Sequence, residues 1–254
     1  MHVTQALDPG WWDLFDPDIP NDVILWAVLT GRCPGAAYLD RREAPAQLVV
    51  REQGGKAFAS ARASEAFLHD VVDHVMDLRW TALADTEIPE SVRDRGRVVG
   101  RTRFEACDLE SKALQLLRDR LPEDFRVERL THRLLDRCHH AKQVLSSSYG
   151  ERLERYFEFG YGICLLHGDD VVSEAYAAFV ADGRVEAVVG TVESFRGRGL
   201  ASIASAYLAE EARERGHELA WNCLVENVAS LKTARRLGFR IERPYQEIYY
   251  SPKT

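Results

Sequence analysis

A glycine-rich segment, Arg196-Gly197-Arg198-Gly199-Leu200-Ala201, is the part of this sequence whose residue types best suit binding chemistry. It follows an apolar run that predicts a strand and precedes an amphipathic run that predicts a helix. A strand that turns into a helix directs main-chain N–H groups and the positive end of the helix dipole at one point, where phosphate binds. Glycine at positions 197 and 199 would allow a close approach of the backbone. The segment therefore predicts a cradle for a phosphate-bearing ligand.

Two common phosphate-binding patterns differ from this segment. A P-loop requires Lys and then Ser or Thr after its last glycine, whereas Leu200 and Ala201 follow here. A dinucleotide fingerprint requires a third glycine, and Ser202 stands at that position. A third phosphate-binding pattern has Arg or Gln, then Gly three positions later, and then Gly or Ala two positions after that. Arg196, Gly199 and Ala201 satisfy it.

With this loop, residues 125–250 resemble the catalytic domain of the GNAT superfamily of N-acetyltransferases, and in particular its zwittermicin-resistance-like members. The resemblance is carried by Glu186, Thr191, the Arg196–Ala201 loop, Trp221-Asn222-Cys223, Asn227, Ser230 and Leu237-Gly238-Phe239. It implies an α+β GNAT fold, a mixed twisted sheet flanked by helices. It also implies transfer of an acetyl group from acetyl-CoA to an amine of a small molecule, such as a natural product or an antibiotic. The alternatives are an acyltransferase that uses a longer acyl-CoA or a carrier-protein-bound acyl group, and a non-catalytic CoA-binding protein.

The resemblance also implies how acetyl-CoA, as co-substrate, would be held. The main-chain amides of residues 197–202 would bind the pyrophosphate, and the strand end at residues 190–192 would pair with the pantetheine arm like an added strand. Asn227 stands where relatives direct a side-chain amide to pantetheine, but it is equally an ordinary cap for the helix near Ser230. The predicted CoA-binding residues are Gly190, Thr191, Val192, Arg196, Gly197, Arg198, Gly199, Leu200, Ala201, Ser202, Asn227 and Ser230.

Acetyl transfer to an amine requires a group that takes the proton of the amine. Glu186 is the preferred catalytic candidate because it lies on the strand that leads into the loop, although it is equally well placed to be a solvated partner of Arg184. Glu193, in the turn before the loop, is the second candidate. Glu174, on the preceding strand, is the third.

The departing thiolate also needs a proton, and here the sequence departs from the family. Many GNAT proteins use a Tyr seven residues after the Asn as this acid, and that position holds Ala234. Tyr245, Tyr249 and Tyr250 are possible substitutes, but aromatic side chains on a strand are more often structural. The pair His139-His140 is expected to be structural or exposed, and no spacing of His, Cys or Asp indicates a metal.

The elements that must position these residues fall into two stretches. In the first, a helix is expected from Ser64, another over residues 110–120, and strands at residues 36–39, 46–51, 57–60, 80–84 and 97–106. Pro122 and its acidic neighbours then interrupt the pattern. Residues 1–122 are therefore predicted to form a degenerate GNAT-like N-terminal domain, and residues 123–254 the catalytic GNAT domain. The first domain would either shape the acceptor pocket, through Trp11, Trp12 and Trp26, or act as a stability module or dimer contact.

From residue 125 onward strands and helices alternate. Strands are expected at residues 126–130, 160–167, 170–181, 184–192, 218–225 and 240–250, and helices at residues 133–145, 200–215 and 230–237. Asp182-Gly183 predicts a two-residue type I′ hairpin turn, and Gly216 predicts a left-handed end to the long helix.

Composition limits the class of protein. A net charge of -7 over 254 residues argues against a nucleic-acid binder and against attraction to anionic membranes. Five scattered cysteines without a C-x-x-C pair argue against disulfides and zinc and favour a reducing, cytoplasmic location. The apolar run at residues 23–29 is too short to span a bilayer, and the first residues do not form a signal peptide. The oligomeric state stays open, with a homodimer as one option.

Overall fold

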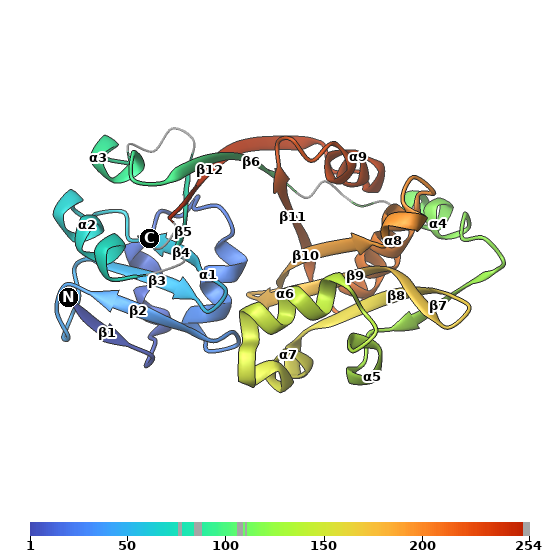
Figure 1. Ribbon diagram of the computed structural model, residues 1–254, viewed down its shortest axis with the longest axis horizontal. Coiled ribbons are helices and arrows are strands. Elements are labelled where there is room, and N and C mark those ends of the chain that lie inside the picture. The colour runs from blue at the N-terminus through green and yellow to red at the C-terminus, as the bar shows by residue number, and fades with distance from the viewer. Residues whose placement is uncertain (76–77, 84–87, 106–108, 110, 251–254) are drawn as a thin grey trace.

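The computed structural model describes residues 1–75, 78–83, 88–105, 109 and 111–250 (Figure 1). Predictions that involve Ala84, Ala106 or Glu110 lie outside the described residues. The strands are β1 (His2–Thr4), β2 (Gly35–Leu39), β3 (Leu48–Glu52), β4 (Lys56–Ala59), β5 (Arg79–Leu83), β6 (Arg97–Glu105), β7 (Phe125–Arg129), β8 (Tyr161–His167), β9 (Asp170–Ala181), β10 (Arg184–Thr191), β11 (Glu218–Leu224) and β12 (Ile241–Tyr249). The helices are α1 (Asp22–Leu29), α2 (Glu65–His74), α3 (Glu90–Arg93), α4 (Ser111–Arg118), α5 (His132–Leu135), α6 (His140–Tyr149), α7 (Leu153–Phe159), α8 (Leu200–Glu214) and α9 (Val228–Leu237), with 3-10 turns at Pro9–Leu14, Gly150–Arg152 and Glu193–Phe195.

The described strands form one mixed sheet in the order β1-β2-β3-β4-β5-β12-β6-β11-β10-β9-β8-β7. Helices cover both faces of its C-terminal part. On one face α8 packs against β8, β9 and β10, with α4 beside it, while α1, α6 and α7 pack against β9 and β10. The α+β prediction of a mixed sheet flanked by helices is therefore confirmed.

Strands cross between the two halves of the sequence. β6, from the N-terminal half, pairs with β11 from Trp221 to Leu224, and it also pairs along its length with β12. β12 in turn pairs with β5, so the last strand of the chain lies within the N-terminal part of the sheet (Figure 1). The boundary predicted at residue 122 lies between α4 and β7, and these ladders cross it.

Local turn signals are confirmed. Asp182 and Gly183 have φ angles of 51° and 70°, as a type I′ turn between β9 and β10 requires. Gly216 follows α8 with φ of 72°, in the left-handed region. Ser64 caps α2 by accepting a hydrogen bond from the Phe67 amide at 3.4 Å.

The single helix predicted over residues 133–145 is wrong, because the chain forms two helices there, α5 and α6. The physical reason is a long-range contact. The carboxylate of Glu174, on β9, accepts hydrogen bonds from the amides of His140 and Ala141, at 2.6 and 2.9 Å, and so fixes a new helix N-terminus. No helix among the described residues is long and apolar enough to cross a membrane.

Candidate functional site

β10 and β11 run parallel for only a short distance and then separate. They pair from Arg184 to Glu186 on β10, opposite Glu218 to Ala220 on β11. Beyond that point β11 stays paired with β6, while β10 stays paired with β9 as far as Thr191. Among the residues that the structure describes, the backbone edge of residues 187–191 that faces β11 is therefore left without a strand partner. An extended chain of amide groups can pair with such an edge.

The glycine-rich loop follows directly. Gly197 and Gly199 have φ angles of 79° and 81°, which only glycine adopts without strain. Among the described residues, Arg196 N donates to Glu193 O and Ser202 N to Gly199 O, but the amides of residues 197–201 donate no such bond. The N-terminal amides of a helix have no partner within the helix. They gather here at the start of the 15-residue helix α8, so the loop presents unpaired donors at the positive end of a dipole.

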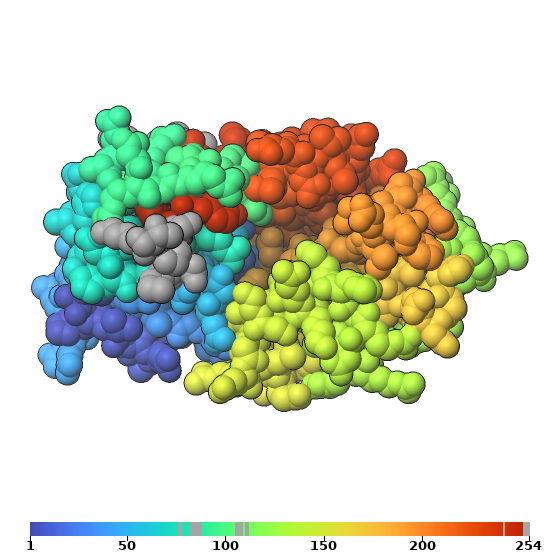
Figure 2. All heavy atoms as spheres, in the orientation of Figure 1, coloured from blue at the N-terminus to red at the C-terminus, as the bar shows by residue number. Residues whose placement is uncertain are grey.

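A cavity of about 950 Å³ joins the open edge to the loop. Figure 2 shows it as a hollow bounded by α9, by the loop at the start of α8 and by α6. All of the predicted CoA-binding residues except Arg198 line it. The Arg198 guanidinium instead lies over the ring of Phe195, 4.8 Å from its centroid. Lys232 and Arg236, on α9, also line the cavity and were not predicted from the sequence.

The two polar residues at the start of α9 have contacts within the protein. Asn227 Oδ1 accepts a hydrogen bond from the Ser230 amide at 3.0 Å, the contact of a helix cap. Ser230 Oγ accepts one from the indole N–H of Trp221 at 3.1 Å. Ala234 stands at the position where many GNAT proteins have the Tyr that acts as general acid, and it is fully buried in the core.

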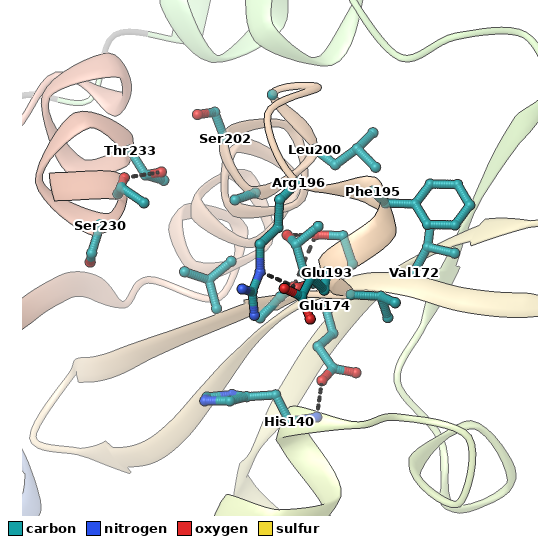
Figure 3. Close-up of a pocket in the computed structure, with 18 of the residues that line it drawn as sticks. His140, Val172, Glu174, Glu193, Phe195, Arg196, Leu200, Ser202, Ser230 and Thr233 are labelled. Atoms are coloured by element: carbon teal, nitrogen blue, oxygen red, sulfur yellow. Dashed lines mark hydrogen bonds between the residues drawn. The ribbon is translucent and has the colours of Figure 1, made fainter. Parts of the chain in front are cut away.

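Two of the three candidate carboxylates line the cavity (Figure 3). Glu193 is exposed in the 3-10 turn before the loop. Glu174 is 4% exposed; one of its oxygens holds the N-terminus of α6, and the other, Oε2, is buried without a hydrogen-bond partner. Arg196 bends back from the loop, and its Nε donates to the Thr191 carbonyl at 3.2 Å.

The third candidate, Glu186, is buried and is not among the residues that line the cavity. Its Oε2 accepts a hydrogen bond from Asn222 Nδ2 at 2.8 Å. Burial raises the pKa of Glu186 to about 7, against the opposing effects of the positive charge of Lys56, the Asn222 hydrogen bond and the positive charge of Arg101. A carboxyl that titrates near neutral pH occurs often at functional sites.

Beside Glu186 lies a cluster of charges that joins the two halves, and it was not predicted from the sequence. Glu247, on β12, accepts hydrogen bonds from Lys56 Nζ at 2.6 Å and from the Tyr249 hydroxyl at 2.9 Å, and Arg101 Nε lies 3.3 Å away. Burial alone would raise the pKa of Glu247, but the charges of Lys56 and Arg101 outweigh it and hold that pKa at about 2. Members of the cluster come from β4, β6 and β12, so only the fold brings them together.

The tyrosines proposed as substitute acids belong to this region and not to the cavity. The Tyr245 hydroxyl accepts from Arg101 Nε at 2.7 Å, and the Tyr250 hydroxyl donates to the Val92 carbonyl at 2.9 Å. Burial raises the pKa of Tyr250 to about 12. The three N-terminal tryptophans, Trp11, Trp12 and Trp26, pack against the core and are likewise not among the cavity residues. No group of His, Cys, Asp or Glu in the described part of the chain is placed to hold a metal ion.

His140, expected to be structural or exposed, lines the cavity. Its Nδ1 lies 3.1 Å from the hydroxyl of Tyr176, and burial lowers its pKa below the usual 6.5, with the Glu174 charge opposing. The sequence signal that could have indicated it is weak, since a His at a helix start is an ordinary residue.

Comparisons with known proteins agree with this geometry. The uncharacterized N-acetyltransferase YdfB of Bacillus subtilis strain 168 is 25% identical over 239 residues, which cover 89% of each chain. The GCN5-related N-acetyltransferase-like protein of Streptococcus suis 89/1591 shares the fold with a TM-score of 0.74 at 24% identity, over 91% of this chain and 94% of that one. A tandem GNAT protein from the clavulanic acid biosynthesis pathway matches 100% of this chain and 99% of its own, with a TM-score of 0.55 and 10% identity. The GNAT acetyltransferase family matches residues 14–248, and the chain belongs to that family.

Proposed function

We propose that the protein transfers the acetyl group of acetyl-CoA to an amine of a small molecule. The observation that carries this proposal is the unpaired edge of β10, which leads within one cavity to the unpaired amides at the start of α8. The amides of residues 197–201 would hold the pyrophosphate, and the edge near Gly190 would pair with pantetheine. Two left-handed glycines without side chains leave the space that a phosphate needs.

The charges around the cavity favour free acyl-CoA over an acyl group on a carrier protein. Arg196, Lys232 and Arg236 line the same cavity as the loop. CoA carries a pyrophosphate and a further ribose phosphate, whereas pantetheine on a carrier protein carries one phosphate. Three cations beside the loop are therefore better matched to the charge of CoA.

The shape of the cavity favours a small acceptor. Helices α6 and α9 face each other across the hollow (Figure 2). A cavity of about 950 Å³ between these helices has room for a small amine next to the end of the β10 edge.

The proton of the amine must pass to a group of the protein or to water. Glu186 has a pKa suited to this step, but it is enclosed and hydrogen-bonded to Asn222, so a proton would reach it only through intervening water. Glu193 and Glu174 line the cavity, and they are the other carboxylates proposed for the step.

The proposal is tested by calorimetric titration of the wild-type protein with acetyl-CoA and with CoA, followed by thiol release over a panel of amines. Binding and turnover on at least one amine are expected. Tight binding of CoA with no turnover on any amine would instead support a non-catalytic CoA-binding protein. No binding of either ligand would contradict the assignment of the cavity.

A further inference from the structure

His140 stands directly over the strand edge at which the donor is expected. A Cβ placed on Gly190 would lie 2.6 Å from the Cβ of His140, so glycine is what lets this helix approach the strand so closely. The position of His140 is also held at its main chain, where its amide donates to Glu174 Oε1 at 2.6 Å. The side chain is therefore fixed beside the last residues of β10 by contacts that do not involve the ring.

The two nitrogens of the ring have different surroundings. Nδ1 lies 3.1 Å from the hydroxyl of Tyr176, whose side chain is fully buried. Burial raises the pKa of Tyr176 well above its usual value, so this hydroxyl keeps its proton. Nε2 has no hydrogen-bond partner among the described residues, and Figure 3 shows the ring turned away from the Glu174 carboxylate. One nitrogen is thus held, and the other is available to a ligand in the cavity.

The charges that face the ring suit a group that gains a proton for a short time. On β9 the titratable groups are Glu174 and Tyr176, and β10 presents only Gly190 at this point. Burial favours the neutral ring, while the negative charge of Glu174 favours the imidazolium. The ring is therefore neutral before reaction, and the positive charge that it acquires is partly compensated.

Building on the proposed function, we propose that His140 Nε2 takes the proton of the acceptor amine directly. The amine nitrogen forms a bond to the acetyl carbon, the carbon–sulfur bond breaks, and the electron pair leaves with the CoA thiolate. The amine proton moves to Nε2, while Nδ1–H donates to the Tyr176 oxygen. That proton then passes from Nε2 to the thiolate, so one residue supplies both the base and the acid that is missing at Ala234.

The three carboxylates are less suited to this step. Glu186 is enclosed and is not among the residues that line the cavity. Glu174 accepts two amides of α6 through Oε1, which ties its carboxylate to that helix start, and its Oε2 is buried. Glu193 lies in the turn next to the glycine-rich loop. His140 lies on the cavity wall next to Gly190, and its Nε2 has no hydrogen-bond partner among the described residues.

The kinetic test compares His140→Gln with the wild-type protein. Gln keeps the backbone amide that binds Glu174, and Lys142→Gln, at an exposed position of the same helix, serves as the matched control. Loss of a general base costs about 100-fold to 10,000-fold in rate, so kcat should fall at least about 100-fold in His140→Gln. Acetyl-CoA affinity by calorimetry should stay close to wild type, and Lys142→Gln should retain activity. Tyr176→Phe removes the positioning hydroxyl and should lower kcat less than His140→Gln does.

An independent arm measures the tautomer of His140 by nitrogen NMR of the imidazole in the CoA-bound protein. The proton is expected on Nδ1 at pH 8, with Nε2 unprotonated. A proton on Nε2 at that pH, or wild-type kcat in His140→Gln, would overturn the proposal. The proposal would also be overturned if the pH profile of kcat kept an acid limb with a midpoint near 7 in His140→Gln and lost that limb in Glu186→Gln. Wild-type protein that fails to bind acetyl-CoA in calorimetry would contradict the proposed function instead, so the binding measurement separates the two failures.

Discussion

Replacing Glu186 with Gln should stabilise the protein, and the gain should depend on pH. Glu186 is 6% exposed, and its Oε2 accepts a hydrogen bond from Asn222 Nδ2. The other polar atom of that amide, Asn222 Oδ1, is buried without a partner. Gln can accept the same bond through its oxygen, and its NH₂ group would offer Asn222 Oδ1 a donor. The substitution removes the charge while keeping the shape of the side chain.

The size of the effect comes from the pKa of Glu186. A rise from 4.5 to about 7 corresponds to about 3 kcal/mol of unfavourable free energy for the ionised form in the folded state. Between these values the folded protein binds more protons than the unfolded chain, so wild-type stability falls as pH rises through this window. Below pH 4.5 the group is neutral in both states and contributes no difference. Glu186→Gln should therefore gain up to about 3 kcal/mol at pH 8.5 and much less at pH 5.

The assay is urea unfolding followed by tryptophan fluorescence at pH 5 and pH 8.5, at constant ionic strength. Glu128→Gln removes an exposed carboxylate that pairs with Arg126, and this control should change stability little at either pH. A gain of equal size at both pH values would show that charge is not its cause. A loss at pH 8.5 would refute the view that the buried charge of Glu186 destabilises the fold.

Three further outcomes are expected. Gly199→Val should abolish CoA binding in calorimetry. The control Gly168→Val, at another left-handed glycine with open space around it, should bear similar backbone strain and keep binding. Equal binding by both variants would show that the pyrophosphate is not held at Gly199. Glu247→Gln should lower the free energy of unfolding by roughly 3–5 kcal/mol in urea titrations, because it leaves the charge of Lys56 buried without its partner; unchanged stability would contradict this role. Residues 123–254 expressed alone should give little cooperative unfolding by circular dichroism, because β12 loses both of its neighbours; a cooperative transition would show that the C-terminal half folds by itself.

Features that depend on neighbouring residues in the chain could be predicted from the sequence. The turn at Asp182-Gly183 and the left-handed end at Gly216 follow from the conformational freedom of glycine and its neighbours. The glycine-rich loop is of the same kind, because its glycines, the preceding strand and the following helix are contiguous. The assembly of its predicted residues around one cavity is found in the structure, and their contacts with CoA stay a prediction.

Features that depend on distant residues could not be predicted. The end of α5 and the start of α6 are set by Glu174, which lies 34 residues beyond His140 in the chain. The pairing of Lys56 with Glu247 spans 191 residues. Periodicity reports which face of an element is apolar, but it does not report which strand lies next to it. His140 was expected to be structural or exposed for this reason, since its place on the cavity wall is fixed by contacts from β9 and β10.

Strands of the N-terminal half pair with β11 and β12, and this pairing helps to hold the candidate site open. The cavity requires β11 to separate from β10 after Ala220, and a strand that leaves one neighbour needs another for its backbone groups. β6 supplies that neighbour from Trp221 onward, and β12 holds β6 in place from its other side. The buried pair of Lys56 and Glu247 then links β12 to β4, since separating the strands would leave the charge of Lys56 in the interior without this partner. The separation of β10 and β11 is therefore maintained by contacts with the half of the chain that lacks the glycine-rich loop.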